Sequence, residues 1–200
     1  MREIAPGLVW FTGFRDSIGL DVSSYWLPQE RVVIDPMVPE EGLDAFADAP
    51  PEHALLTNRH HDRGAWDYVE RFGSTVHCVR QGLHELEGRG EVTPFDFGDE
   101  LPGGITAHEV DAISPDETAL HIPNRSAVAC ADGVVHYGGL HFVPDNLMDD
   151  PEETKAALRA AYGRLAETLE FDNLLVAHGE PVVGGAREAL RAFASPGADA

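Results

Sequence analysis

Hydrophobic and polar positions in the first half of the chain form short apolar or alternating runs, separated by Gly, Pro and Asp. Such runs are typical of β-strands. They predict strands at 7–12, 23–27, 31–34, 54–57 and 75–79, and short helices toward Phe46, over 64–72 and over 82–87.

The second half is richer in strand-like runs. The pattern predicts strands at 92–95, 105–110, 118–122, 126–131, 133–137 and 173–177. Asp132-Gly133 between two of these runs predicts a hairpin turn. Asp150-Pro151 begins a long helix that runs to about Leu169, because Asp is a favoured N-cap and Pro a favoured first helical residue. A last amphipathic helix covers 186–193, and 195–200 is predicted to be a disordered tail.

This order of elements indicates an α+β fold in which two β-sheets are sandwiched between helices. A chain of 200 residues with 43% hydrophobic content is long enough for one well-buried domain and short for two. No internal repeat or linker interrupts the pattern. The sequence therefore predicts a single domain over residues 1–200.

Charge and cysteine usage limit the partners and the compartment. The chain has 35 acidic and 14 basic residues, a net charge of −21, and Lys155 is its only lysine. Such a surface repels nucleic acid and anionic membranes, whether the acid excess reflects a salt-rich habitat or genome composition. Cys78 and Cys130 are expected to be buried thiols. Without an apolar run long enough to span a membrane or a secretory signal, we expect a cytoplasmic protein, and a homo-oligomer is compatible with the sequence.

The candidate chemistry is concentrated where one apolar run ends. Residues 55–57 lead directly into Asn58-Arg59-His60-His61-Asp62-Arg63, and a second strand-like run ends in His178-Gly179. Imidazole and carboxylate side chains close together at strand ends are the groups that a metal site or an acid–base site needs.

Four segments, in order, resemble the metallo-β-lactamase superfamily, and within it the hydroxyacylglutathione-hydrolase-like (glyoxalase II-like) branch. They are a strand ending in Asp35, the segment 56–63, the helix over 150–169 with Phe171-Asp172, and the strand ending in His178-Gly179. The second of these lies where the family carries Thr-His-x-His-x-Asp-His. The resemblance implies a four-layer αββα sandwich and a pair of zinc ions.

The same resemblance implies that several metal ligands have been replaced. Asn58 and Arg63 stand where the motif has its first and last His, Ile113 stands at the third mid-chain ligand, and Gly139 at the bridging Asp. The remaining metal ligands are then His60, Asp62 and His178, with Asp62 as the catalytic residue. His61 occupies the variable position of the motif and is expected to face away from the pocket.

Two functions follow from this interpretation. The first is a protein that binds metal weakly or not at all, with no cofactor, and uses the old cleft for a small anionic ligand or a partner, held by Asn58, Arg59 and Arg63. In that case Arg63 either supplies a missing cation's charge in a cluster with His60, Asp62 and His178, or points to solvent while Ile113 fills the cavity. The alternative is a metal-dependent hydrolase of small thioesters or esters with a remodelled mononuclear zinc site, to which His141 or His121 is a candidate further ligand.

Overall fold

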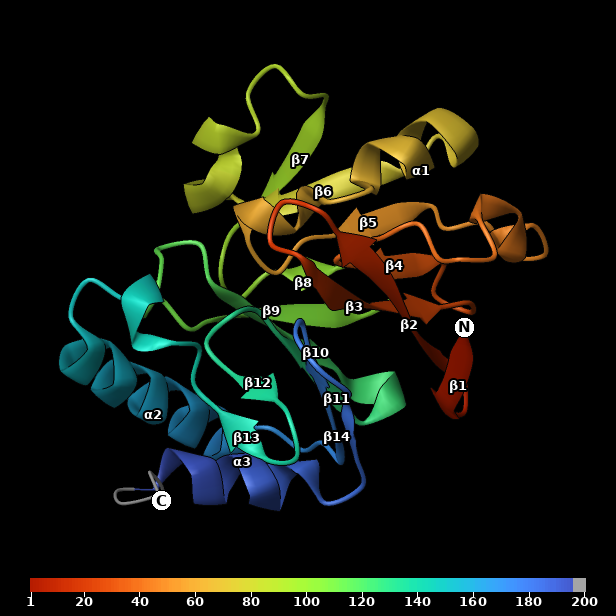
Figure 1. The fold of residues 1–200 in the computed structure, drawn as a ribbon. Helices are drawn as coiled ribbons and strands as arrows, with labels where there is room; N and C mark the ends of the chain where they lie inside the picture. The colour runs from red at the N-terminus through yellow and green to blue at the C-terminus, as the bar shows by residue number, and fades with distance from the viewer. Residues whose placement is uncertain (196–200) are drawn as a thin grey trace.

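The computed structural model describes residues 1–195, which fold into a four-layer sandwich (Figure 1). Seven strands form the first sheet in chain order: β1 (Arg2–Ala5), β2 (Leu8–Arg15), β3 (Leu20–Leu27), β4 (Val32–Ile34), β5 (His53–Leu55), β6 (Thr75–Val79) and β7 (Val92–Phe95). Six form the second, in the order β15 (Val182–Val183), β14 (Asn173–Val176), β11 (Ala127–Cys130), β10 (Thr118–Ile122), β9 (Ile105–Glu109) and β8 (Glu100–Leu101). β12 (Val135–His136) and β13 (Leu140–His141) pair separately.

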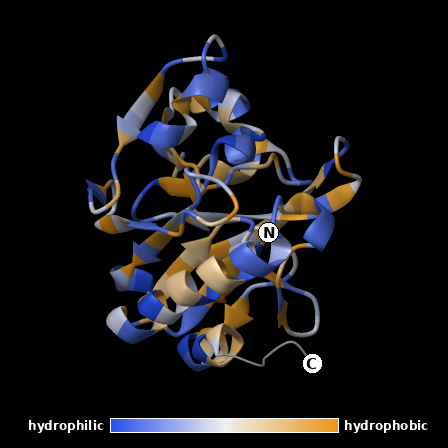
Figure 2. Ribbon diagram, turned by 90° about the vertical axis from the view of Figure 1, so that its left-hand side faces the viewer, coloured by the Kyte–Doolittle hydropathy of each residue, from blue (hydrophilic) through white to orange (hydrophobic). Residues whose placement is uncertain are grey.

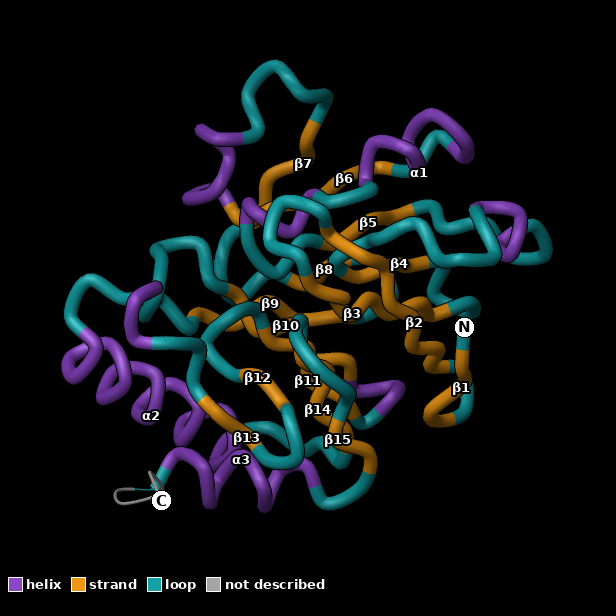
Figure 3. Tube along the Cα trace, in the orientation of Figure 1, coloured by secondary structure: helices purple, strands orange, loops and turns teal. Residues whose placement is uncertain are grey.

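The helices lie outside the two sheets (Figure 3). α1 (Ala65–Phe72) covers the first sheet, and α2 (Pro151–Thr168) and α3 (Ala186–Ala194) cover the second. Short 3₁₀ turns complete the chain: η1 (Leu43–Phe46), η2 (Arg59–Asp62), η3 (Arg80–Glu85), η4 (Pro123–Arg125) and η5 (Asp145–Leu147). The predicted αββα sandwich is confirmed.

Three hydrophobic cores hold the layers together. Between the sheets, residues such as Leu27, Ile34 and Leu120 are completely buried. Outside the first sheet, the Phe46 ring makes edge contacts with four aromatic rings at centroid distances of 5.0 to 6.4 Å. Outside the second sheet, Tyr162 of α2 packs in the third core. Figure 2 shows the consequence: hydrophobic strands fill the interior, and much of the hydrophilic colour lies on the peripheral helices and loops.

Strand direction determines where the functional side chains lie. β4, β5, β6 and β7 are parallel, and β11 is parallel to β14. Parallel neighbours end at the same edge of a sheet, so the loops after β4 and β5 adjoin, as do those after β11 and β14. Two backbone hydrogen bonds join these edges: Ser23 N–H to Ala177 O, and Thr118 N–H to Thr57 O, both at 2.9 Å. The two pairs of loops therefore share one rim of the sandwich.

Most predicted elements are present within one to three residues of their expected ends. Asp150 caps α2 as expected, with its carboxylate accepting from Glu153 N–H at 3.1 Å. Both cysteines are buried and free, as predicted. Of the predicted tail, Ser195 is the C-cap of α3, and 196–200 lie outside the described residues. No helix among the described residues is long and apolar enough to cross a membrane.

The hairpin predicted at Asp132-Gly133 is wrong. β11 pairs with β10 and β14, whereas β12 pairs with β13 in a different sheet. A type I′ turn requires a positive φ at both central residues, and neither Asp132 nor Gly133 has one. The Asp-Gly pair instead ends a buried strand at the shared rim.

An acid-sensitive pair of histidines links the first residue of β5 to the middle of β6. His53 Nδ1 lies 3.1 Å from His77 Nε2, and burial together with His53 lowers the pKa of His77 to about 4. The unfolded chain, with an ordinary histidine pKa of about 6.5, binds the proton first. The contribution of His77 is therefore fully present above about pH 6.5 and is lost as the pH falls through 4.

We expect His77→Leu to reduce the loss of stability between pH 6.5 and 4 by about 2 kcal/mol, because the variant no longer has this proton to bind. The measurement is urea unfolding at a series of pH values. His84→Leu, which removes an exposed imidazole, is the control and should keep the wild-type slope. An unchanged slope in His77→Leu would contradict the assignment.

Candidate functional site

The loop after β5 folds into the 3₁₀ turn η2. Asn58 caps it, because its Oδ1 accepts from His60 N–H at 2.9 Å, and His61 N–H donates to Asn58 O at 3.2 Å. The turn is kinked at His61, whose φ of −95° and ψ of 17° depart from helical values, so the side chains of His60 and His61 leave it in different directions. His60 consequently points outward with 55% of its side chain exposed, whereas His61 is directed inward and 4% exposed. The expectation that His61 faces away is wrong, and the turn geometry is the reason.

Asp35 fixes the orientation of His61. It follows β4, and its carboxylate accepts from Thr57 N–H at 2.8 Å and from Thr57 Oγ1 at 2.6 Å, and lies 2.9 Å from His61 Nδ1. Burial raises the pKa of Asp35, but His61, Arg63 and Thr57 together lower it by more. The pKa of Asp35 therefore lies below the ordinary value. An ionised Asp35 holds the proton on Nδ1 and leaves His61 Nε2 directed across the rim.

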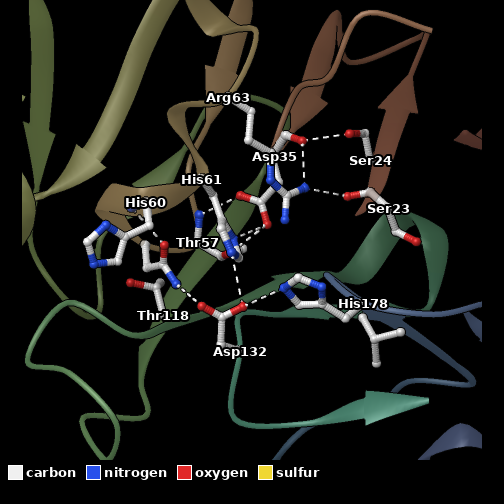
Figure 4. A network of polar contacts seen from close by, with 12 residues as sticks. Ser23, Ser24, Asp35, Thr57, His60, His61, Arg63, Thr118, Asp132 and His178 are labelled. Atoms are coloured by element: carbon white, nitrogen blue, oxygen red, sulfur yellow. Dashed lines mark hydrogen bonds and ion pairs between the residues drawn. The ribbon is translucent and has the colours of Figure 1, made fainter. Parts of the chain in front are cut away.

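Asp132 and His178 complete a cluster at the ends of β11 and β14. His61 Nε2 lies 3.1 Å and His178 Nε2 3.0 Å from the same oxygen, Asp132 Oδ1. Figure 4 shows His61 between the two aspartates, with the His178 ring directed at the Asp132 carboxylate. The ligand atoms of His61, Asp132 and His178 all lie within 4.8 Å of one another. Two imidazoles and a carboxylate thus converge from three loops.

Opposite charges in the cluster shift one another's pKa values, which stabilises the ionised Asp132 and the protonated His61. Burial raises the pKa of Asp132, but both histidines lower it, and it lies well below its usual value. Burial and Arg63 lower the pKa of His61, but Asp132 and Asp35 raise it, and the net pKa is higher than usual. Asn58 Nδ2 donates to Asp132 Oδ2 at 3.0 Å. Asp35, Thr57, His61, Asn58, Asp132 and His178 therefore each make at least one side-chain hydrogen bond within the cluster.

Glu117 connects the loop before β10 to the loop that carries Asp132. Its carboxylate accepts from Gly133 N–H at 2.5 Å and from Ile113 N–H at 3.2 Å. Burial, and then the charge of Asp132, raise the pKa of Glu117 to about 7. The bond from Gly133 N–H fixes the backbone next to Asp132, and the bond from Ile113 N–H holds Glu117 in place.

Arg63 points into the protein. Its Nη1 donates to Ser23 O at 2.7 Å and to Asp35 O at 3.2 Å, and its Nε is buried without a hydrogen-bond partner among residues 1–195. Burial lowers the pKa of Arg63, against the opposing effect of Asp35 and Asp132. The expectation that Arg63 points to solvent is therefore wrong, and so is its expected pairing with Asp62.

The other residues singled out in the motif lie apart from this cluster. The Asp62 carboxylate accepts from Trp66 Nε1 at 3.1 Å and pairs with Arg89 at 2.9 Å. Arg59 pairs with Asp116 and Glu85. The polar cluster expected from His60, Asp62, Arg63 and His178 is not assembled, because the 3₁₀ turn directs His60 outward and Asp62 toward α1. Of the three expected metal ligands, the structure places only His178 among the converging groups.

The sequence pattern does not point to Asp132, because Asp-Gly between two strand-like runs indicates a hairpin turn. The available signal was a run of four buried small residues, Ala127–Cys130, leading to an aspartate. Ile113 lines the cleft, as the motif position suggests. His121 contacts Glu170 O, and His141 is exposed, so neither joins the cluster.

A cleft of about 650 Å³ opens above the cluster. Its polar lining comes from the cluster and its surroundings: Arg15, His60, His61, Arg63, Asp132 and His178. The rest of the lining is apolar except for Tyr137. The volume lies in the range of small-molecule sites, which combine apolar walls with a few convergent polar groups.

Comparison with solved structures identifies the fold of this chain. A di-iron-bound structure of the protein TTHA1623 is 23% identical, with a TM-score of 0.69 over 93% of this chain and 98% of that one. The mono-zinc form of the metallo-β-lactamase FIM-1 from Pseudomonas aeruginosa is 13% identical, with a TM-score of 0.72 over 99% and 95%. The flavodiiron protein from Giardia intestinalis is 20% identical, with a TM-score of 0.67 over 96% and 58%.

The chain therefore has the metallo-β-lactamase fold. At 13% to 23% identity, the likeness establishes the fold alone. No family model and no curated protein matches the sequence.

We expect Asp35→Asn to destabilise the protein by about 3 kcal/mol, because the variant leaves a buried guanidinium and imidazolium without their nearest counter-charge. Urea unfolding at pH 7 measures the loss. The matched control is Asp62→Asn, which changes an equally buried carboxylate outside the cluster. It should cost about 1 kcal/mol, since the amide oxygen can still accept from Trp66. The opposite ranking of the two variants would contradict the role given to Asp35.

Proposed function

We propose that this chain binds one divalent metal ion through His61, Asp132 and His178, and that it hydrolyses small ester or thioester substrates in the cleft above them. The observation that supports this most strongly is the convergence of the three ligand atoms within 4.8 Å. Three protein ligands with an open side are typical of a catalytic metal centre, whereas structural centres have four.

The donor set fits such an ion. Two imidazole nitrogens and one carboxylate oxygen suit zinc and ferrous iron. Metal-binding histidines usually donate their second N–H to a carboxylate, and Asp35 already occupies that position on His61. Bound there, the ion would polarise a carbonyl group and make a water molecule acidic enough to be a nucleophile near neutral pH.

The chain's own residues supply the remaining requirements. Asp35 holds His61 in one orientation, and Asn58 and the Glu117–Gly133 bond hold Asp132. The apolar walls of the cleft exclude water from the bound substrate. The order of the four motif segments supports a relationship to the hydroxyacylglutathione-hydrolase-like branch, with some ligand positions replaced.

A metal-free binding protein is the second candidate, and the hydrogen bonds of Asp132 favour it. The Asp132 carboxylate accepts from two imidazoles and one amide, and Arg63 adds a permanent positive charge nearby. Such a site is suited to a small anionic ligand. Metal titration distinguishes the two candidates.

We expect zinc titration of the wild-type protein, followed by calorimetry at pH 7.5, to show one equivalent bound. Asp132→Asn and His178→Ala should weaken binding by about 100-fold or more, because each removes a ligand from a set of three. Affinity should also fall at lower pH, since the ion competes with the proton that His61 binds.

His60→Ala and Asp62→Asn are the matched controls, because they change the neighbouring histidine and aspartate outside the cluster. Both should bind zinc as the wild type does. Hydrolysis of a panel of aryl esters and thioesters should follow the same ranking. Equal zinc binding by wild type and Asp132→Asn would contradict the proposed centre and favour the metal-free candidate.

A further inference from the structure

The structure carries an inference about the substrate, which rests on the proposed function. We propose that the cleft binds the unbranched alkyl chain of a hydrophobic carboxylic acid or its ester, with the chain along the apolar wall and the carboxyl end beside Arg63. Hydrolysis then adds water across the acyl bond: the acyl carbon gains the oxygen, the leaving group takes one proton, and the acid product releases another at neutral pH.

The first support is where exposed apolar side chains gather. Six large hydrophobic residues among those described are highly exposed, and four of them line this cleft: Ile18 at 49%, Leu20 at 50%, Tyr137 at 56% and Leu147 at 60%. Exposed apolar residues are usually scattered singly, and a group of them marks a binding surface. They come from the turn between β2 and β3, the first residue of β3, the turn after β12, and η5.

The apolar wall continues from the mouth toward the polar cluster. Val22 and Val135 are buried and line the cleft, and Ile113 lines it from the loop between β9 and β10. An aliphatic residue stands at Ile113, where the motif comparison expects a metal ligand. The side chain therefore adds hydrophobic surface next to the ligand cluster and favours an alkyl group there over a polar one.

The second support is that two arginines line this cleft, with Arg63 at the inner end of the wall and Arg15 beside Leu20 at the mouth. Within residues 1–195 neither arginine makes a direct ion pair with a carboxylate, although the charges of Asp35 and Asp132 act on Arg63 from further away. This is unusual in a chain with 35 acidic and 14 basic residues. Arg59, also expected at the ligand, is already paired with Asp116 and Glu85. Positive charge at one end of an apolar cleft complements an amphiphile with a carboxylate head.

The test measures binding of straight-chain alkanoates from four to ten carbons by calorimetry, below the concentrations at which they aggregate. Affinity should rise about fourfold for each added methylene group, as expected for burial of an alkyl chain. Octan-1-ol should bind at least about tenfold more weakly than octanoate, because it lacks the charge that Arg63 attracts. This comparison probes the carboxyl end without substituting Arg63, whose replacement disturbs the core of the site.

Two variants test where the alkyl chain of the ligand lies in the cleft. Leu147→Ser should weaken octanoate binding about fivefold or more, because it removes apolar surface at the mouth. Phe14→Ser is the matched control, since Phe14 is as exposed, at 58%, and does not line the cleft. Equal effects of the two variants, or an affinity that does not depend on chain length, would overturn the proposal. Equal binding of octanol and octanoate would contradict the placement of the ligand's carboxyl end beside Arg63.

Titrations run on both chelator-treated and zinc-loaded protein separate this inference from the proposed function. Chain-length dependence in both samples supports the alkyl site whether or not zinc binds. If zinc binds stoichiometrically but alkanoate affinity does not change with chain length, the proposed metal centre stands and the proposed alkyl site is rejected. A readout by binding, not by turnover, keeps the two results independent.

Discussion

The buried carboxylate of Asp35 is the group on which the rest of the site depends. It stands at the end of β4, takes two hydrogen bonds from Thr57 at the end of β5, and contacts His61 Nδ1 four residues later. The two loops are thereby locked to each other by charge-assisted hydrogen bonds in a water-poor environment, where such bonds are strong. The orientation of His61 follows from this, and with it the direction in which Nε2 points.

The parallel strands explain why a second set of groups meets the first. β11 and β14 end side by side, so Asp132 and His178 leave the second sheet at neighbouring positions. The bonds between Ser23 and Ala177 and between Thr118 and Thr57 hold the two rims together. Four loops from distant parts of the sequence are therefore brought to one place by topology, and side-chain chemistry selects which residues face inward.

Much of the fold could be predicted from the sequence because strands and helices are encoded locally. The largely apolar run at 118–122 and the Asp150 cap each indicate an element without reference to the rest of the chain. The site was less predictable. His60 and His61 are adjacent and chemically identical, and only the 3₁₀ turn capped by Asn58 decides which one is buried. Asp132 was missed for a related reason: Asp-Gly favours a hairpin locally, but the pairing of β11 with β14 overrides that preference.

The balance of charge in the cluster also limits what it can hold. Asp35 and Asp132 bring two negative charges, and Arg63 brings one permanent positive charge that no pH change removes. In the absence of metal, a proton on His61 neutralises the remainder, which is why its pKa is raised. A divalent ion that displaces this proton leaves the cluster with a single excess positive charge. A second ion would face that excess, which already includes the guanidinium charge, at short range in a low-dielectric site, where like charges repel strongly. In the proposed metal centre, the permanent charge of Arg63 therefore favours one metal ion over two.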